Sequence, residues 1–583
     1  MTHEFHLSVR RASTEQASEL TVSSVRGASL ATSIDGTVAV AVAVPGSSEA
    51  HGAARYVEAY LDNARDPSKC GTGDVAAVVI DRSKSSVTVT AAPIGSRQVF
   101  WAASDGELSV GSHPLELGCL ANRVPPIRPE SLFQYIYFHM LPGPASVFEG
   151  ISKLEGGHGL RWDGQTVQVQ RYWRPRFDDA TQISEAEAGR QLHQLLHEAV
   201  ARELNREERA GAFLSGGLDS STVAGKAAAL RPGIPTVTMG FEAAGYDEME
   251  YARIASRHFG TTPLEYYVTP EDVLATLPKI AAAFPEPFGN SSAAAAFHCA
   301  RIAREHGIGL LLAGDGGDEI FGGNDRYARQ LVFERYGRIP AALRKAILEP
   351  LVGAAGRITR AFPIGKAVSY IEQANVPLPD RLQAYNFLHR HDPAEVFAPD
   401  LLAQVDASAP MRALREEYAT PATSDPVNRM LFLDWKFTLH DNDLVKVNTM
   451  CDLADVEVAY PMLDPALVDF SRRLPGDWKV RNGQLRWFYK RAMRGFLPDA
   501  IIDKTKHGFG LPFGVWTRTH TGLQRLADDC LGSLSGRGYF RREFIRDAQR
   551  MHREGHAAYY GELVWILMVL ELWVQAHFPN ARL

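Results

Sequence analysis

Cysteine is scarce in this sequence, and its residues are scattered without any pair spaced as C-x-x-C. This scatter excludes a disulfide framework and a cysteine zinc site, and it predicts reduced thiols. Residues 1–5 show no basic segment that leads into an apolar one, so no secretory signal is expected there. We therefore predict a cytoplasmic protein. The cysteines are Cys70, Cys119, Cys299, Cys451 and Cys530.

Long hydrophobic runs and a strong charge of one sign are also lacking. The most apolar late run, residues 563–570, stops at Glu571 and is too short to span a bilayer, so we predict a core helix and no membrane partner. A net charge of -6 over 583 residues argues against general nucleic-acid binding. What is present is an ordinary globular composition, 45% hydrophobic and 22% charged, in a chain long enough for two or three domains.

The strongest local signal lies at residues 214–221. The apolar residues before it predict a strand, and the residues after it predict a helix. Gly216 and Gly217 allow a tight turn between the two, which aims backbone N–H groups and the positive end of the helix at one point. Such a point binds an anion, most often a phosphate. The stretch has no Gly-Lys-Ser/Thr ending, so it is not the P-loop of kinases and GTPases.

The side chains of this stretch favour a nucleotide with a metal ion. Asp219 does not suit bare phosphate, but it suits a phosphate that carries Mg²⁺. The stretch resembles the SGGxDS loop of the ATP pyrophosphatase group, whose members split ATP between the α and β phosphates and adenylate a substrate oxygen. The alternative is a Gly-Ser turn without a ligand. The ATP-binding residues predicted here are Leu214, Ser215, Gly216, Gly217, Asp219, Ser220 and Ser221.

From residue 210 onward strands and helices alternate, which predicts an α/β fold with a doubly wound parallel sheet. Strands are expected at residues 211–214, 235–241, 264–268 and 308–314, and a helix at 247–258. Ligands of such sheets bind at the carboxyl ends of the strands, where Leu214, Met239 and Gly314 lie. By the resemblance, Met239 and Gly240 hold the adenine; the alternative for Met239 is core packing.

The strand that ends at Gly314 leads into Asp-Gly-Gly-Asp-Glu-Ile-Phe-Gly-Gly, which resembles the asparagine synthetase stretch SGxGxDExFGG. Its glycines allow a loop close to phosphate, so Gly314 and Gly316 are predicted ATP-binding residues. Asp318 is placed to join Asp219 on Mg²⁺, because two carboxylates and phosphate oxygens make an ordinary magnesium shell. Asp315 is a candidate catalytic carboxylate. The alternative is a solvated acidic turn, which the preceding apolar strand disfavours.

Residues 446–464 resemble the family stretch K-x-D-R-x-S-M followed by E-x-R-x-P-F-L-D. Glu457 falls on the acidic position that lies beside the acyl-adenylate in the family. A carboxylate there can orient an incoming amine and accept its proton; the alternative is a glutamate in a structural salt bridge. Asn448 and Thr449 replace the family's Asp-Arg, and Ala459 replaces its Arg. The loss of two guanidinium groups disfavours a small amino-acid acceptor such as aspartate.

Residues 485–512 resemble a further family pattern, lR…R-x-K-x-G-F-x-x-P. Arg486 and Lys506 stand out from this basic region because they match the pattern. The resemblance implies that Lys506 is catalytic and neutralises the leaving pyrophosphate and the charge that builds on the adenylate. That is electrostatic stabilisation aimed at the place where charge develops.

The N-terminal part is expected to be rich in strands. Strands are expected at residues 37–44, 74–80, 86–91, 98–103 and 107–111. Residues 72–173 resemble the second half of the glutaminase domain of asparagine synthetases, which uses an N-terminal cysteine. Position 2 is Thr2, and the family's glutamine-binding RLSI and NGE stretches have no counterpart before residue 50. Although threonine can act as an N-terminal nucleophile, we predict a scaffold without glutaminase activity.

The domain organisation follows from these resemblances. Residues 1–173 are predicted to form a β-rich, degenerate class II glutamine amidotransferase-like domain of the N-terminal-nucleophile type. Residues 184–583 are predicted to form the ATP pyrophosphatase domain with helical additions, and its first helix starts at a capping-box pattern of Ser184 and Glu187. The helical segment 324–440 shows no chemistry and is expected to cover the site.

The resemblance implies an ATP-dependent, AMP-forming amide ligase that uses ATP and Mg²⁺. Because members that lost the cysteine resemble lasso-peptide cyclases and β-lactam synthetases, we favour closure of a macrolactam on a peptide carboxylate. A leader peptidase or a precursor-recognition protein would then be a partner. The alternatives are an amide ligase on a small molecule, such as an ammonia-dependent asparagine synthetase or an enzyme for a sugar acid, and a non-catalytic nucleotide binder.

Overall fold

The structure is a computed structural model, and it describes residues 5–14, 17–26, 29–42, 49–63, 76–95, 97–104, 106–117, 125–178, 183–243, 247–358, 363–504, 510–555 and 557–580. Thr2 and Lys506 therefore lie outside the described residues, as do Cys70 and Cys119.

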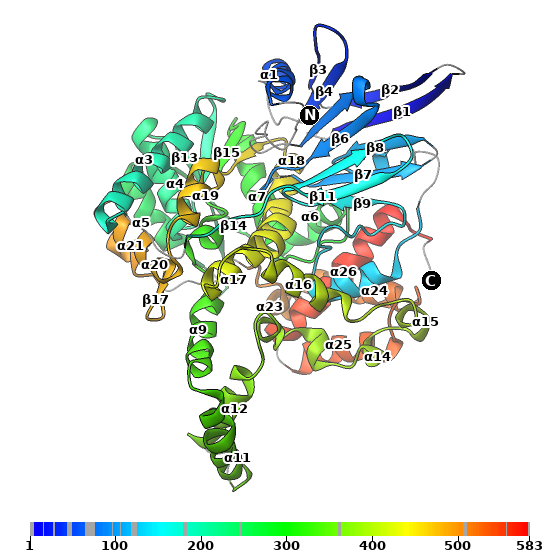
Figure 1. Cartoon of the computed structure of the whole chain (residues 1–583). Helices are drawn as coiled ribbons and strands as arrows, with labels where there is room; N and C mark the ends of the chain where they lie inside the picture. Colours follow the sequence, from blue (N-terminus) through cyan, green and yellow to red (C-terminus); the bar gives the residue numbers. More distant parts are fainter. Residues whose placement is uncertain are drawn as a thin grey trace.

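Two antiparallel sheets make up most of the N-terminal part, as the sequence predicts. They face each other across one apolar core, to which Leu7 and Leu108 of the first sheet and Val87 and Trp162 of the second belong. Helix α1 covers the outer face of the second sheet through Tyr56 and neighbouring side chains. Figure 1 shows this part in blue and cyan.

The first sheet has the order β2-β1-β8-β7-β9 and the second β11-β10-β6-β5-β4-β3. The elements of this part are β1 (His6–Thr14), β2 (Ala17–Arg26), β3 (Ser29–Thr32), β4 (Val38–Val42), α1 (Glu49–Asp62), β5 (Ala77–Asp81), η2 (Arg82–Lys84), β6 (Ser86–Thr90), β7 (Val99–Ser104), β8 (Glu107–Gly111), η3 (Pro114–Glu116), α2 (Pro129–Phe138), β9 (Ser152–Leu154), β10 (His158–Trp162) and β11 (Val167–Arg171).

A five-stranded parallel sheet organises the C-terminal part, in the order β14-β13-β12-β15-β16. Strand β15, next to the middle strand β12, buries Leu310 and Leu312 in one core with α3 and α4, and Leu311 in a second core with α7. Both faces are therefore covered, which confirms the doubly wound α/β prediction. The chain moves outward in opposite directions from β12 and β15, so their junction is the switch point, where ligands of such sheets bind.

The sheet and its helices begin and end close to the expected positions. Asp247 was expected inside a helix, but its side chain accepts from the N–H of Met249 and α5 starts there. The elements are α3 (Glu185–Leu204), β12 (Ala210–Phe213), α4 (Leu218–Leu230), β13 (Pro235–Phe241), α5 (Met249–Phe259), β14 (Thr262–Val268), α6 (Pro270–Ala283), α7 (Ser292–Glu305), β15 (Leu310–Leu312), α8 (Gly317–Phe321) and β16 (Glu457–Ala459).

The segment expected to be helical is helical, and its first half extends away from the body as an arm (Figure 1). A long π-helix, η7, follows in its second half. The elements are α9 (Asp325–Gly337), α10 (Ala341–Leu343), η5 (Arg344–Leu348), α11 (Glu349–Ile358), α12 (Ile364–Ala374), η6 (Asp380–Gln383), α13 (Phe387–Arg390), α14 (Pro393–Val396), α15 (Pro399–Leu402), α16 (Ala409–Ala419), α17 (Pro426–Asp434), η7 (Trp435–Asp443) and α18 (Leu444–Leu453).

The last helices close the core, and α26 carries the apolar run at residues 563–570 as a buried core segment, as predicted. In the described part of the chain, no helix has both the length and the apolarity of a membrane span. The elements are η8 (Pro461–Leu463), α19 (Pro465–Arg472), α20 (Gly476–Lys479), β17 (Val480–Arg481), β18 (Gln484–Leu485), α21 (Trp487–Met493), α22 (Asp499–Ile502), α23 (Phe513–Thr519), α24 (Thr521–Ser535), α25 (Arg542–Glu554) and α26 (Ala557–His577).

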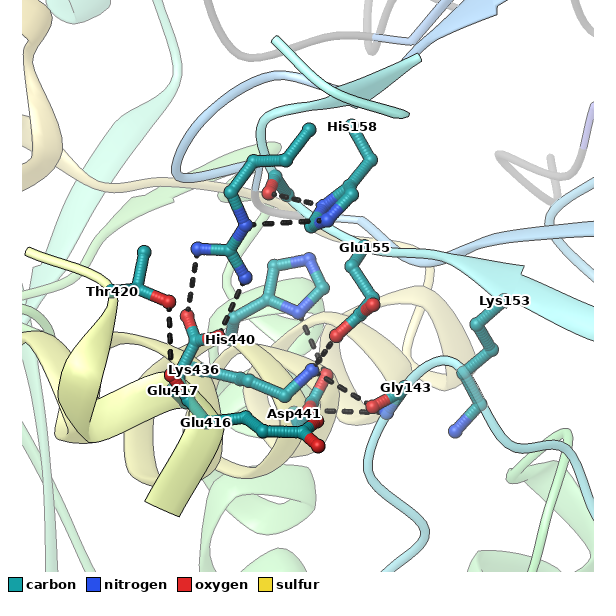
Figure 2. A network of polar contacts seen from close by, with 12 residues as sticks. Gly143, Lys153, Glu155, His158, Glu416, Glu417, Thr420, Lys436, His440 and Asp441 are labelled. Carbon is teal, nitrogen blue, oxygen red and sulfur yellow. Dashed lines mark hydrogen bonds and ion pairs between the residues drawn. The ribbon is translucent and has the colours of Figure 1, made fainter. Parts of the chain in front are cut away.

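A buried polar network ties the N-terminal part to the π-helix (Figure 2). Lys436 forms an ion pair with Glu155 and donates to the Gly143 carbonyl at 2.8 Å. Asp441, five residues further along the π-helix, accepts from the Gly143 N–H at 3.2 Å. Because charges buried away from water are costly unless paired, these contacts fix how the π-helix sits against residues 143–155.

Candidate active site

The loop between β12 and α4 has the tight turn that its glycines predict. Gly216 has φ +68, a conformation that favours glycine, and a Cβ there would lie 2.4 Å from the Ala252 nitrogen. Gly217 is the N-cap residue of α4, so the first N–H groups of this helix point out of the loop. The sequence therefore brings a helix N-terminus to the switch point of the sheet.

The serines of the loop hold its shape. The Ser220 hydroxyl accepts from the Ser215 N–H at 3.2 Å and lies 3.0 Å from the Ser215 hydroxyl. The Ser221 hydroxyl is buried without a hydrogen-bond partner among the described residues. A buried hydroxyl of this kind costs about 1–3 kcal/mol until a polar atom reaches it. Leu214 is buried, and its carbonyl accepts from the Thr238 hydroxyl at 2.7 Å.

The acidic loop after β15 lies directly against this first loop. A Cβ on Gly314 would lie 2.6 Å from the Ser220 nitrogen, and one on Gly317 would lie 2.1 Å from an Asp219 oxygen. Gly316, at φ +96, also leaves no space for a side chain because Leu463 lies beside it. The glycines are thus required for the two loops to touch, which brings the two predicted phosphate loops together.

Asp219 and Asp318, the two predicted metal ligands, meet on one guanidinium group. Arg486 donates to both Asp219 oxygens at 2.5 and 2.6 Å, and it lies 2.7 Å from an Asp318 oxygen. Its side chain is only 4% exposed, and its backbone has φ +54. A non-glycine residue in that region is strained, and such strain is concentrated at functional sites. Burial opposes the charge of Arg486, but the two carboxylates raise its pKa.

This arrangement suits a magnesium ion that is shared with phosphates. One cation already bridges the two carboxylates, so their oxygens converge on a single point. Among the described residues no group of three or more His, Cys, Asp or Glu side chains could hold a metal. A magnesium ion here would therefore take two protein carboxylates and complete its shell with phosphate and water oxygens, which is how Mg²⁺ usually binds in nucleotide sites.

Asp315 begins the acidic loop and is half-buried. Burial, together with the charges of Asp443 and Asp219, raises its pKa to about 6, and Lys446 only partly offsets this. Lys446 forms an ion pair with Asp443 at 2.8 Å. A carboxyl group with a pKa near neutrality can take up and release a proton at cellular pH, so Asp315 fits its expected catalytic role. The sequence patterns gave no reason to single out Asp443.

Met239 and Gly240 lie near the carboxyl end of β13. Met239 is buried in the core that contains α7, which is the placement that the core-packing alternative describes. A Cβ on Gly240 would lie 2.6 Å from the Tyr267 ring, so this glycine is required by its neighbour on β14. Met239 and Gly240 thus border the switch point.

Glu457 does not lie with the acidic residues described above. It begins β16 and pairs in register with Leu310, which begins β15, so it lies at the amino end of the sheet. With a rise of about 3.3 Å per residue, Glu457 is about 7 Å further from the carboxyl edge than Ala459. Its carboxylate lies 3.4 Å from the Arg206 guanidinium, which is the salt bridge of the alternative interpretation.

The residues that replace the family's charged positions form a neutral, buried environment. Asn448, in the place of the family's aspartate, accepts from the Tyr460 hydroxyl at 3.0 Å. Ala459 is buried at the end of β16. Lys504, which sequence reasoning missed, lies 2.9 Å from Glu248 and donates to the Gly216 carbonyl at 3.5 Å. Lys504 thus contacts the loop between β12 and α4.

Comparisons with known proteins match two parts of the chain. The family model described as asparagine synthase matches residues 191–575, and the model of a glutamine amidotransferase domain matches residues 57–173. The chain is 24% identical over 485 residues to asparagine synthetase [glutamine-hydrolyzing] 1 of Bacillus subtilis, covering 82% of this chain and 74% of that protein.

It is also 27% identical over 438 residues to a putative asparagine synthetase [glutamine-hydrolyzing] of Mycobacterium tuberculosis, covering 73% of this chain and 65% of that protein. The chain therefore spans about two thirds to three quarters of the length of these relatives. Because the asparagine synthase model covers well over half of its residues, the chain belongs to the asparagine synthase family.

Proposed function

We propose that this protein activates a carboxylate of a peptide with ATP and closes a macrolactam with an amine of the same molecule, as lasso-peptide cyclases do. Membership in the asparagine synthase family supports the general reaction, ATP-dependent formation of an amide bond. The observation that carries the proposal is that the two glycine loops meet at the switch point of the sheet. There Asp219 and Asp318 both pair with the guanidinium group of Arg486.

The reaction has two balanced steps. In the first, a substrate carboxylate oxygen attacks the α-phosphorus of ATP, the bond to the β-phosphate oxygen breaks, and pyrophosphate leaves. In the second, the amine nitrogen attacks the acyl carbon, the bond to the AMP oxygen breaks, and AMP leaves. The amine loses one proton, and the carboxylate of Asp315, with a pKa of about 6, is suited to accept it.

The chain's own residues bind and orient the reactants in these steps. Bound Mg²⁺ would supply charge neutralisation on the phosphates, held by Asp219 and Asp318. The N-terminus of α4 and the Gly216 N–H would bind the pyrophosphate part of ATP. Lys506, by its match to the family pattern, would stabilise the negative charge on the leaving pyrophosphate.

Two observations support an amine from the substrate itself over ammonia from glutamine. Position 2 is Thr2, and no cysteine precedes Cys70 in the sequence. Asn448, Thr449 and Ala459 also stand where the family has charged groups, which could bind the second carboxylate and the ammonium of free aspartate. A linear peptide precursor would then involve a leader peptidase or a precursor-recognition protein as a partner.

A second candidate is an amide ligase for a small molecule, including an ammonia-dependent asparagine synthetase. The names of the two relatives favour it, since both contain asparagine synthetase. The match of an amidotransferase model to residues 57–173 favours a glutamine-linked activity in the same way.

Pyrophosphate release separates these candidates. The purified full chain would be incubated with MgATP and each of three substrate sets: aspartate with ammonium, aspartate with glutamine, and linear peptides with a free N-terminus and an internal Asp or Glu. We expect AMP and pyrophosphate only with a peptide, together with a product lighter by one water. Asparagine formation would instead support the second candidate, and nucleotide binding without AMP from any set would support a non-catalytic binder.

A further inference from the structure

The arm that extends from the body carries one long helix at its end. The elements α10, η5 and α11 follow one another without a break from Ala341 to Ile358. At 1.5 Å per residue this helix is about 27 Å long. Figure 1 shows α11 at the far end of the arm, away from the sheets. The arm's own helices α9 and α12 hold it in place, so one of its sides faces solvent.

The side of this helix that packs on the arm carries charged groups. The Arg344 guanidinium lies 5.1 Å from the centre of the Tyr336 ring on α9. Glu349 accepts from the Tyr336 hydroxyl and from the Asn375 amide, both at 3.2 Å. Glu349 is the one acidic residue between positions 335 and 354. The negative charge of the helix is therefore turned toward the arm and away from solvent.

The outer side of the helix is exposed and apolar. Leu343 is 43%, Ile347 48% and Leu351 64% exposed, and they follow one another at every fourth position. An amphipathic helix of a globular protein normally turns such a side toward a core, and a contiguous exposed apolar patch marks an interaction surface. We call this side the apolar face. It consists of Leu343, Ala346, Ile347, Pro350, Leu351, Gly353 and Ala354, all of which are exposed.

Exposed basic side chains accompany the apolar face. Arg335 and Arg338 precede the helix, Lys345 lies on it, and all three are exposed. Four of the five charged residues at positions 335–354 are basic, although the whole chain has a net charge of -6. Like charges repel, so the ends of two arms would repel each other, whereas an anionic partner would be attracted. The charges therefore favour an anionic partner over a second copy of this face.

The apolar face offers no group for the specific recognition of a protein. None of its side chains carries a hydrogen-bond donor or acceptor, and none is aromatic. Protein interfaces depend on a few anchors, most often Trp, Tyr and Arg, and this face has none of them. Lipid chains require apolar contact alone, and anionic headgroups attract basic side chains beside it. The surface of an anionic bilayer therefore matches this part of the arm better than an acidic protein does.

We propose that the end of the arm binds the surface of an anionic lipid bilayer. The apolar face enters the boundary between headgroups and acyl chains, and Arg335, Arg338 and Lys345 contact the headgroups. This binding goes beyond the proposed function and does not depend on the ligase reaction. The prediction of no membrane partner rests on the lack of a run that could span a bilayer, and a helix that lies in the plane of the interface needs no such run.

Flotation with lipid vesicles tests the proposal. The purified full chain would be mixed with vesicles of phosphatidylcholine alone, or of phosphatidylcholine and phosphatidylglycerol in equal parts. At about 0.1 M salt we expect at least tenfold tighter binding to the mixed vesicles. This preference should disappear at about 1 M salt, where charges are screened beyond ~3 Å. Equal binding to both kinds of vesicle at low salt, or binding to neither, would overturn the proposal.

Three variants at exposed positions locate the binding. Leu351→Ser should weaken binding to the mixed vesicles about tenfold, because an apolar side chain no longer enters the bilayer. Lys345→Gln should weaken it about fivefold, because one basic side chain near the anionic surface is lost. Val169→Ser is the matched control, since Val169 is 45% exposed on β11 in the N-terminal part, and it should leave binding unchanged. Circular dichroism would check that each variant is folded. Equal binding of all three variants and wild type would contradict the assignment to the arm.

Other results would identify a different occupant. If wild type sediments as a dimer and Leu351→Ser as a monomer, the apolar face pairs with a second copy and the lipid proposal is wrong. If soluble polyglutamate binds wild type and Leu351→Ser alike while vesicles bind neither, the basic residues bind an acidic protein and the lipid proposal is also wrong. Pyrophosphate release without vesicles is a separate measurement, which Leu351→Ser should leave unchanged, so failure of the proposed ligase activity would not affect the lipid proposal.

Discussion

The two ends of the parallel sheet carry the same kind of contact, a carboxylate on an arginine, with very different surroundings. At the carboxyl end, Arg486 is 4% exposed and bridges Asp219 and Asp318 at 2.5–2.7 Å. At the amino end, Arg206 is 35% exposed and meets Glu457 at 3.4 Å. The first contact lies on a buried arginine and is shared by two loops. The second is half-exposed, and its arginine also pairs with Glu203 at 2.5 Å.

The pairs of Arg486 therefore shape the candidate site, whereas the pair of Arg206 and Glu457 lies at the surface. Exposed ion pairs contribute about 0–1 kcal/mol, because water screens them and both side chains lose freedom. A buried pair behaves differently, since removal of one partner leaves an uncompensated charge inside the protein. Substitutions at the two ends should therefore have effects of very different size.

The largest effect is expected for Arg486→Gln. The change leaves two half-buried carboxylates without the guanidinium group that bridges them, which we expect to lower the free energy of unfolding by about 3 kcal/mol, the lower end of the range for a buried pair. Mg²⁺ should restore part of this loss in the variant, because a divalent cation can take the place of the guanidinium between the carboxylates. Thermal unfolding of both proteins with and without millimolar Mg²⁺ measures this.

Arg486→Lys is the matched control. It keeps one positive charge but not the planar group that reaches both carboxylates, so its stability should lie between the other two. If Mg²⁺ raised the unfolding temperatures of wild type and Arg486→Gln by the same amount, the two carboxylates would not form the cation site.

The position of Arg486 shows what the sequence could and could not supply. Local patterns were sufficient for the strands, the helices and the glycine turns, because apolar periodicity and backbone conformation are set by neighbouring residues. They were also sufficient to choose Asp219 and Asp318. Arg486 follows Asp219 by 267 positions, so its place between them depends on tertiary packing that no local pattern encodes.

Glu457 shows the opposite case: it matches a family motif, but it does not lie beside the acidic loop. Its distance from that loop follows from the register of β16 against β15, which starts with Leu310 opposite Glu457. The register of β16 on β15 depends on the packing of the whole core, which a local motif does not encode.

The next effect concerns the rate of the reaction. Lys506→Ala should lower the rate of pyrophosphate release about 10²–10³-fold, because a group that stabilises developing charge is lost. Thr2→Ala should leave the rate unchanged, since we expect no N-terminal nucleophile. Both rates would be measured with saturating ATP and the best peptide substrate. Loss of activity in the Thr2 variant would restore an N-terminal nucleophile, and full activity of Lys506→Ala would remove that lysine from the reaction.

A pH-dependent effect is expected for Asp315→Asn. The pKa of Asp315 is about 6 in the folded protein and 3.8 in the unfolded chain. Between about pH 4 and 6 the folded state therefore binds a proton that the unfolded state has released, so stability falls as the pH rises. The full loss above pH 6 is about 3 kcal/mol. The asparagine variant lacks this loss, so its stability relative to wild type should increase from pH 4 to 6 and then stay constant. A difference that is constant from pH 4 to 8 would contradict the raised pKa.

The smallest effect is expected for Glu457→Gln. Its carboxylate contacts a half-exposed arginine at the amino end of the sheet, so the free energy of unfolding should change by no more than about 0.5 kcal/mol. The rate of amide formation should stay within about twofold of wild type, whereas loss of a base that accepts the amine proton costs about 10²–10⁴-fold. Arg206→Gln is the control for activity, since it removes the same contact from the other side, together with the ion pair to Glu203. If Glu457→Gln lost activity by a hundredfold while Arg206→Gln did not, the carboxylate would reach the acyl group during the reaction, and the two ends of the sheet could no longer be assigned separate roles.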